Sequence, residues 1–203
     1  MGLINLPKNI YSTTWAARPT ASTMTGKIVR FSDVGYGSGL FISNGTRWQP
    51  LGGSCMIAQS NVASSVTGTS AETFLATIPI PAGFMSANGI LEISSLWNYT
   101  NAATSRNLRC RVGQTTAASS ILSSTATTTT TAQMKFYLRN ANSVSSQVCQ
   151  PIGFIQTYTT STSTSTSYSI DTSLDFNVYF SATLTDTSQT VTLESYTIFY
   201  TEG

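Results

Sequence analysis

Residues 174–184 read Leu-Asp-Phe-Asn-Val-Tyr-Phe-Ser-Ala-Thr-Leu, with an apolar side chain at every even-numbered position. Successive side chains of a β-strand point to opposite faces of the sheet, so this alternation predicts a strand with one buried face. It is the clearest run of period two in the chain. We therefore expect a fold built from sheets that are packed on one side, as antiparallel sheets commonly are.

The same alternation recurs in neighbouring segments, with turn signals such as Asn88-Gly89 between them. The apolar positions are Phe74, Ala76, Ile78 and Ile80; Leu91, Ile93 and Trp97; Leu108, Cys110 and Val112; and Met134, Phe136 and Leu138, with residues 191–200 closing the series. Residues 148–155 predict a weaker strand at a sheet edge, because Pro151 and Gly153 interrupt it. About seven or eight strands without helical periodicity predict an all-β fold, an antiparallel β-sandwich that is jelly-roll-like.

The N-terminal third differs from this pattern. Residues 1–25 have no period and are expected to form an extended N-terminal arm. Residues 26–53 predict a small β-hairpin unit, in which Asn44-Gly45 favours a type I′ turn with positive φ at both central residues. Three short strands bury little area, so this unit is expected to lean on a neighbour or on copies of itself. Residues 54–70 are expected to be a linker, and 71–203 the β-sandwich domain.

The composition argues against catalysis. The 203 residues include no histidine, and only 9% of them are charged. Most enzymes at neutral pH use histidine, paired carboxylates, an activated thiol or a metal. The eight acidic residues have no spacing that pairs two of them, and there is no GxSxG motif or metal-ligand cluster. We expect no catalytic residue, no metal, no cofactor and no enzyme activity.

Charge and cysteine content limit the partners further. A net charge of +2 gives little attraction to nucleic acid or a membrane surface. No apolar run approaches the ~20 residues of a membrane span. The three cysteines, Cys55, Cys110 and Cys149, are widely spaced and odd in number, which favours small buried thiols in a reducing compartment. We expect neither a nucleic-acid partner nor a membrane.

Two serine- and threonine-rich tracts have two interpretations. Residues 125–131 and 157–169 fit either solvated loops or strands that are polar on both faces. As strands they would form an exposed contact surface with a weakly specified register.

Two further groups of residues are candidates for contact with a ligand or partner. Arg109 and Arg111 share one strand face and would meet an acidic partner or a charged glycan, or else simply discourage edge pairing. Trp97 and Tyr99 would form a sugar-stacking platform, or else belong to the core or to an interface.

The N-terminal third resembles a module of tailed-bacteriophage virion proteins. The resemblance lies in Trp15-Ala16-Ala17-Arg18-Pro19-Thr20, Gly26, Arg30, Asp33-Val34-Gly35 and Gly45-Thr46-Arg47-Trp48-Gln49-Pro50, and continues in residues 78–83, 88–89 and 96–100. It implies a non-enzymatic part of the virion surface, often a trimer, without saying whether the part sits on the head or the tail. The lack of a long repetitive shaft favours a short capsid decoration or head-fibre protein.

These observations give one main hypothesis. The N-terminal region anchors the chain to a phage capsid or tail protein, and the sandwich forms a homotrimeric body on the virion surface after assembly in the host cytoplasm. The residues expected at the particle-anchoring interface are Trp15, Arg18, Arg30, Arg47 and Trp48, since arginine and tryptophan are enriched at interfaces; alternatively, Arg47 and Trp48 only close their own hairpin. The alternative function is a tail-fibre or receptor-binding module that recognises a glycan on the host surface.

Overall fold

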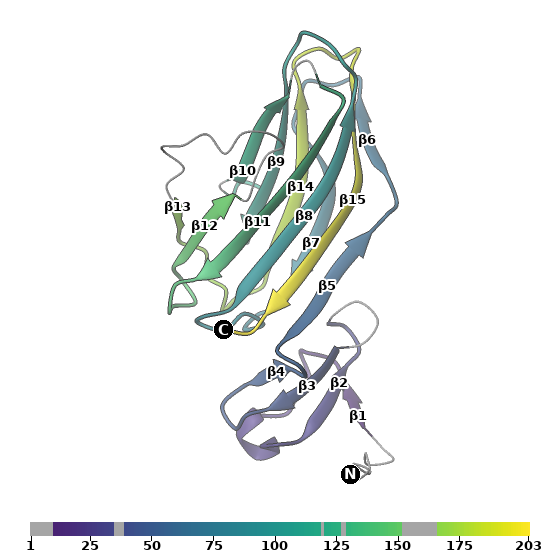
Figure 1. Cartoon of the computed structure of the whole chain (residues 1–203). Helices are drawn as coiled ribbons and strands as arrows, with labels where there is room; N and C mark the ends of the chain where they lie inside the picture. Colours follow the sequence, from purple (N-terminus) through teal and green to yellow (C-terminus); the bar gives the residue numbers. More distant parts are fainter. Residues whose placement is uncertain (1–9, 35–38, 119, 127–128, 152–165) are drawn as a thin grey trace, which may run out of the picture. The chain divides into compact units, whose positions relative to one another are not determined.

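The computed structural model describes residues 10–34, 39–118, 120–126, 129–151 and 166–203. Strands dominate these residues, and their helical content is one short 3₁₀ helix, η1 (Ala21–Met24), as Figure 1 shows. The chain divides into two compact units, Met1–Cys55 and Met56–Gly203. Each unit has its own hydrophobic core.

The N-terminal unit is a four-stranded sheet packed on an aromatic cluster. Its strands are β1 (Tyr11–Thr13), β2 (Ile28–Phe31), β3 (Gly39–Ser43) and β4 (Trp48–Pro50), hydrogen-bonded in that order. β1 runs parallel to β2, whereas the other two pairs are antiparallel. Trp15, Phe31, Phe41 and Trp48 pack edge to face, with centroids 5.0 to 5.5 Å apart. Such pairs add about 0.5–1.5 kcal/mol each beyond their buried area.

The described part of the expected N-terminal arm, residues 10–25, is folded into this unit. β1 pairs with β2, and Trp15 enters the core, where its backbone N–H donates to a carboxylate oxygen of Asp33 at 2.7 Å. The physical reason is that three short strands lack apolar area, and Trp15 supplies it. Residues 1–9 of the expected arm lie outside the described residues.

The connection between β3 and β4 is also different from the expected type I′ turn. Gly45 has a positive φ of 91°, but Asn44 is not among the described residues with positive φ. Instead, Oδ1 of Asn44 accepts hydrogen bonds from the backbone N–H groups of Thr46 (3.0 Å) and Arg47 (2.9 Å). The asparagine side chain thus closes a four-residue loop, as asparagine often does in turns.

The C-terminal unit consists of two facing sheets (Figure 1). The four-stranded sheet has the order β10-β9-β14-β7, and the seven-stranded sheet has the order β13-β12-β11-β8-β15-β5, with β6 also paired to β15. The bounds are β5 (Ser54–Ser60), β6 (Ser64–Thr67), β7 (Thr73–Ile80), β8 (Ile90–Tyr99), β9 (Arg106–Gly113), β10 (Ser120–Ala126), β11 (Thr131–Asn140), β12 (Gln147–Pro151), β13 (Thr166–Tyr168), β14 (Phe176–Leu184) and β15 (Thr190–Thr201).

Residues 176–184 form β14, which lies between β9 and β7. Val178, Phe180 and Ala182 are fully buried. Phe180 contacts Trp97 of the opposite sheet at a centroid distance of 6.3 Å and stacks on Tyr196 at 5.3 Å. The antiparallel β-sandwich expected from the sequence is therefore confirmed. The order of its strands, on which a jelly-roll description depends, comes from the structure alone.

Three polar segments differ from expectation. Residues 54–70, expected to be a linker, contain β5 and β6, and hydroxyl pairs such as Thr67–Thr190 (2.6 Å) join β6 to β15. The described part of the strand expected at an edge is β12, which is not at the edge because β13 pairs with it at Gln147, Val148 and Cys149. Residues 152–155 of that expected strand lie outside the described residues. Residues 125–126 lie in β10 and Thr131 begins β11, whereas residues 127–128 and most of the second tract lie outside the described residues. Strands that are polar on both faces carry no apolar alternation, so the period-two test misses them.

Candidate functional site

Two of the five expected anchoring residues are core residues. Trp15 is 3% exposed and Trp48 is 4% exposed, and the indole N–H of Trp48 donates to the carbonyl of Pro19 at 2.8 Å. Their large apolar area is needed to hold a small sheet together, so they do not present a surface to a particle. The expectation that these tryptophans contact a partner directly is corrected accordingly.

Arg18 is also engaged inside the unit. Its guanidinium lies 4.6 Å from the centroid of the Trp15 ring and donates to the carbonyl of Trp15 at 2.7 Å. Burial lowers the pKa of Arg18, although arginine stays charged at neutral pH. Arg18 therefore fixes the position of Trp15 by a cation–π contact and a hydrogen bond.

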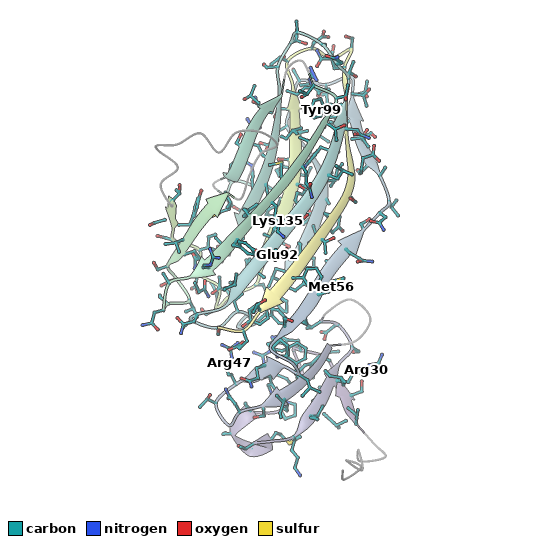
Figure 2. All side chains as sticks on the ribbon, viewed as in Figure 1. Arg30, Arg47, Met56, Glu92, Tyr99 and Lys135 are labelled. Atoms are coloured by element: carbon teal, nitrogen blue, oxygen red, sulfur yellow. The ribbon has the colours of Figure 1, made fainter. Side chains whose placement is uncertain are left out.

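Arg30 is the exposed member of the set, whereas Arg18 and Arg47 are partly buried. Figure 2 labels Arg30 and Arg47 on the N-terminal unit. Arg47 is partly exposed in the loop between β3 and β4. Arg30 is exposed on β2, and its side chain forms no hydrogen bond or ion pair with the residues that the structure describes. Of the five candidates, Arg30 is thus the best placed to meet a partner.

The strand register places Arg30 in an ordered surface. Its Cα pairs with that of Leu40, and the backbone N–H of Leu51 donates to the carbonyl of Leu40 at 2.8 Å. Arg30, Leu40 and Leu51 thus form one row across β2, β3 and the residue that follows β4, and Ser12 of β1 pairs with Arg30 on its other side. Ile28, Ile42 and Gln49 form a second row. We call these six residues the outer face, because the aromatic core occupies the other side of the sheet.

The two units carry opposite net charges. Residues 1–55 hold five basic residues and one acidic residue, a net charge of +4, and residues 56–203 hold five basic and seven acidic residues, a net charge of −2. The basic residues of the first unit are Lys8, Arg18, Lys27, Arg30 and Arg47. Its acidic residue, Asp33, uses one carboxylate oxygen for the backbone of Trp15. The small overall charge of the chain hides this separation.

Trp97 and Tyr99 do not form an open sugar-stacking platform. Trp97 is fully buried, and its indole N–H donates to the Ser95 hydroxyl at 2.9 Å. Tyr99 is also buried, and the guanidinium of Arg106 lies 5.0 Å from the centroid of its ring. The structure thus places both aromatic residues in the core, and a ligand cannot stack on them.

Arg109 and Arg111 share a strand face as expected, but Glu72 neutralises part of their charge. Arg111 binds the Glu72 carboxylate through Nε (3.0 Å) and Nη2 (2.8 Å), and Arg109 Nη1 lies 3.6 Å from it. The Ser181 hydroxyl donates to the same carboxylate at 2.6 Å. The Arg111 hydrogen bond, followed by weaker contributions from Ser181 and Arg109, lowers the pKa of Glu72.

Two of these charged residues could hardly be identified from the sequence. Glu72 precedes β7 and is outside its alternating run, so only the fold brings it to Arg109 and Arg111. Arg106 is buried at the start of β9, where its guanidinium donates to the carbonyls of Thr100, Ala102 and Thr104. A buried arginine cannot be told from an exposed one by residue type alone.

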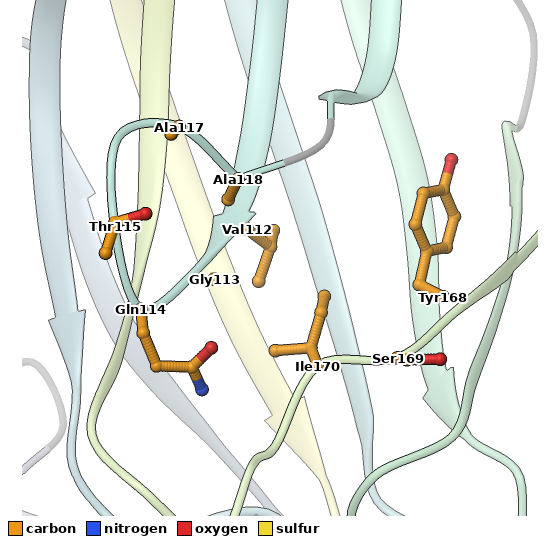
Figure 3. A pocket seen from close by; sticks show the side chains of 9 residues that line it. All are labelled: Val112, Gly113, Gln114, Thr115, Ala117, Ala118, Tyr168, Ser169 and Ile170. Carbon is orange, nitrogen blue, oxygen red and sulfur yellow. The ribbon is translucent and has the colours of Figure 1, made fainter.

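A pocket of about 320 Å³ opens in the sandwich, between the β9–β10 connection and the segment that follows β13 (Figure 3). Its lining residues are Val112, Gly113, Gln114, Thr115, Ala117, Ala118, Tyr168, Ser169 and Ile170. Tyr168 stands on one side and Gln114 on the other (Figure 3). None of these nine residues carries a charge at neutral pH. The pocket offers hydroxyl, amide and aromatic groups to a small neutral ligand, but no acid, base or metal ligand.

The thiols are poor nucleophiles. Cys110 and Cys149 are buried, Cys55 is partly buried, and all three are free. Burial raises the pKa of Cys149 to about 11 and that of Cys55 to about 12. Within the described residues, no group of three metal-ligating side chains comes together, and no helix has the length and hydrophobicity needed to cross a membrane.

Comparisons with known proteins give only distant likenesses. No protein-family model matches the sequence, and the search of curated proteins finds no match. Among solved structures, the chain is similar to the CBM2 module of the evolved Dit of Lactobacillus casei BL23 phage J-1. The identity is 6% and the TM-score 0.35, with 63% of this chain and 69% of that chain covered.

Two structures of infectious bursal disease virus are also similar. The Gx strain structure has 13% identity, a TM-score of 0.24 and coverage of 73% of this chain and 42% of that chain. The VP2 subviral particle has 11% identity, a TM-score of 0.26 and coverage of 73% and 41%. TM-scores this low carry no conclusion about function, so the function is inferred from the residues of this chain.

Proposed function

We propose that this chain is a non-enzymatic structural protein of a bacteriophage virion, a short capsid decoration or head-fibre protein. In this proposal the N-terminal unit attaches the chain to the particle, and the sandwich forms the outward body. The chain assembles as a homotrimer, on the virion surface, from subunits made in the host cytoplasm.

One observation carries the proposal. The sequence that resembles a phage virion module, from Trp15 to Pro50, folds as a separate unit around Trp15 and Trp48. Phe31 and Phe41 complete that core. A unit with its own core can serve as an attachment module that is joined to a different body. The tryptophans of the motif therefore build the module, and other residues of it contact the particle.

The chemistry of the described side chains supports a role without catalysis. Cys55 and Cys149 have pKa values raised to about 12 and 11, so that their thiols stay protonated at neutral pH. Glu72 is held by two arginines and a serine, and has no free partner carboxylate beside it. These groups stabilise the fold.

Binding of the full-length chain to particles tests this proposal. Particles from a phage that lacks this chain are mixed with purified protein and sedimented. We expect the protein to sediment with the particles, and light scattering to give a mass three times that of the 21.7 kDa chain. A monomer that stays in the supernatant would contradict the proposal.

The pocket beside Tyr168 favours a second candidate function, a tail-fibre or receptor-binding module that recognises a neutral glycan. Hydroxyl and amide groups from Thr115, Ser169 and Gln114 line it together with the Tyr168 ring. Its volume of about 320 Å³ is at the lower end of the range for ligand pockets. A glycan array probed with the wild type and with Tyr168→Ala tests this candidate, which requires binding that the substitution abolishes.

A further inference from the structure

We propose that the outer face of the N-terminal sheet binds an acidic protein surface on the particle, with Arg30 as its central cation. This inference rests on the proposed function, because it names the surface by which the N-terminal unit attaches. The outer face consists of Ile28, Arg30, Leu40, Ile42, Leu51 and Gln49.

The two sides of the N-terminal sheet differ in how they are covered. The inner side is covered by the aromatic core, whereas Leu40 on the outer side is 36% exposed and Leu51 is 44% exposed. Of the eight large hydrophobic residues that are exposed in the described chain, four belong to the N-terminal unit, which is much the smaller of the two. Two of these four, Leu40 and Leu51, lie side by side on the outer face, and adjacent exposed apolar side chains are typical of interaction sites.

The outer face has the composition of a protein–protein interface. Two rows of three residues cross neighbouring strands, which are about 4.8 Å apart in a sheet. In these rows Leu40 of β3 lies on one side of Arg30 and Ser12 of β1 on the other, and no acidic residue is among them. An apolar centre with an arginine is typical of the buried part of protein–protein interfaces.

The positive charge of the N-terminal unit favours an acidic partner. The unit has a net charge of +4, and Arg18 is already bound to the ring and carbonyl of Trp15. The Arg30 guanidinium has no partner of its own among the described residues. Its planar array of donors matches a carboxylate bidentately, and apolar neighbours that exclude water strengthen such a pair. Charge complementarity therefore selects an acidic surface.

Other occupants fit this face less well. Nucleic acid is held by many lysine and arginine contacts to phosphates. Contact between phosphates and the apolar side chains of Leu40 and Leu51 would not stabilise such a complex. A second copy of the chain that docked face to face would bring two Arg30 side chains toward each other, and like charges at an interface are costly. An acidic protein surface satisfies both the arginine and the aliphatic side chains.

The test uses full-length protein, particles that lack this chain, and two charge reversals. Arg30→Glu changes the outer face. Lys27→Glu makes the same change in charge at an exposed residue of the same unit that is not part of the outer face. We expect Arg30→Glu to weaken binding to the particles at least about tenfold, and Lys27→Glu to weaken it less than about threefold. Leu40→Ser should weaken binding by a factor that changes little with salt.

The possible outcomes separate the two proposals. If the wild type fails to bind particles, both the proposed function and this inference are overturned. If the wild type binds and Arg30→Glu binds equally well, only the outer face is excluded. Equal weakening by the two charge reversals would mean a diffuse charge effect, and a change of mass in light scattering with Arg30→Glu would mean contact between copies; either result overturns the inference. Unchanged circular dichroism shows that each variant is folded.

Discussion

The faces of the sheets are covered in different ways in the N-terminal unit and in the sandwich. The sandwich buries the inner faces of two sheets against each other, and charged and hydroxyl groups on its outer faces pair locally, while Leu96 and Phe199 stay exposed there. Examples of this pairing are the Lys135–Glu92 pair at 2.6 Å (Figure 2), the Arg111–Glu72 pair at 2.8 Å and the Thr67–Thr190 hydroxyl pair. The N-terminal unit has a single sheet, covers one side with aromatic rings, and leaves aliphatic side chains and Arg30 on the other.

This difference indicates where a partner is required. A surface whose charges and hydroxyls are already paired gains little from a partner, because new contacts must replace existing ones. A surface that exposes apolar area and an unpaired guanidinium gains from both desolvation and charge pairing. Attachment is therefore expected in the smaller and more basic unit.

The largest expected effect comes from the two cores. Phe31→Ala should destabilise the N-terminal unit, and Phe180→Ala the sandwich, by about 3–5 kcal/mol each. Both phenylalanines are fully buried among other aromatic rings. If the cores are separate, each substitution should shift one unfolding transition in urea and leave the other unchanged. Loss of both transitions with Phe31→Ala would show that the two units do not unfold independently.

The next largest change in stability is expected at a buried cation, Arg106. Arg106→Met should destabilise the sandwich by about 3 kcal/mol, because the carbonyls of Thr100, Ala102 and Thr104 lose their donor and Tyr99 loses its cation–π contact. Urea denaturation measures this change. Arg139→Met is the matched control, since Arg139 is exposed on β11, and it should cost less than about 1 kcal/mol. Equal costs would show that the buried position of Arg106 is unimportant.

The Glu72 cluster is expected to give a smaller, pH-dependent effect. Glu72→Gln should cost about 2 kcal/mol at pH 7, since it removes charged hydrogen bonds to Arg111 and Ser181. The lowered pKa of Glu72 means that this stabilisation is present above the ordinary glutamate pKa of about 4.3 and is lost as the pH falls through the folded value.

The two proteins should therefore approach equal stability in acid. Urea denaturation at pH 7 and at progressively lower pH measures the difference. A gap between wild type and Glu72→Gln that stays constant on acidification would show that the carboxylate charge is not responsible for it.

The loop between β3 and β4 should give the smallest effect. Asn44→Ala removes the acceptor for the N–H groups of Thr46 and Arg47 and should destabilise the N-terminal unit by about 1 kcal/mol. Asn44→Asp keeps an oxygen acceptor and should stay close to the wild type. Thermal unfolding followed by tryptophan fluorescence, which reports on Trp15 and Trp48, compares the two. Equal losses would mean that the side-chain oxygen does not close this loop.

The sequence predicted the sandwich because its central strands alternate. β14 places apolar residues at every second position, and β8 and β11 do so except at Ser95 and Asn140; burial of one face favours that pattern. The apolar residues of β5 are consecutive and do not alternate, so it was included in the expected linker. β6, β10 and β13 were missed or left open because serine and threonine predominate in them and they lie at the sides of the sheets. Their pairing depends on neighbours distant in sequence, such as β15 for β6.

The candidate site was predictable only in part. Residue type identified Trp15 and Trp48 as important, but it could not show that their side chains point into the core. The period-two pattern of β2 and β3 could have shown that Arg30 and Leu40 share the opposite face from Phe31 and Phe41. Their position side by side depends on the register of β2 and β3, which the alternation of apolar residues alone does not determine.

The most direct test of the central claim is a cryo-electron microscopy reconstruction of particles that carry this chain. We expect the N-terminal unit, residues 10–55, to contact the shell through its outer face. We also expect Arg30 to lie beside an acidic side chain of the shell. The sandwich should lie further out. A reconstruction in which the sandwich contacts the shell, and the N-terminal unit points into solvent, would contradict this arrangement.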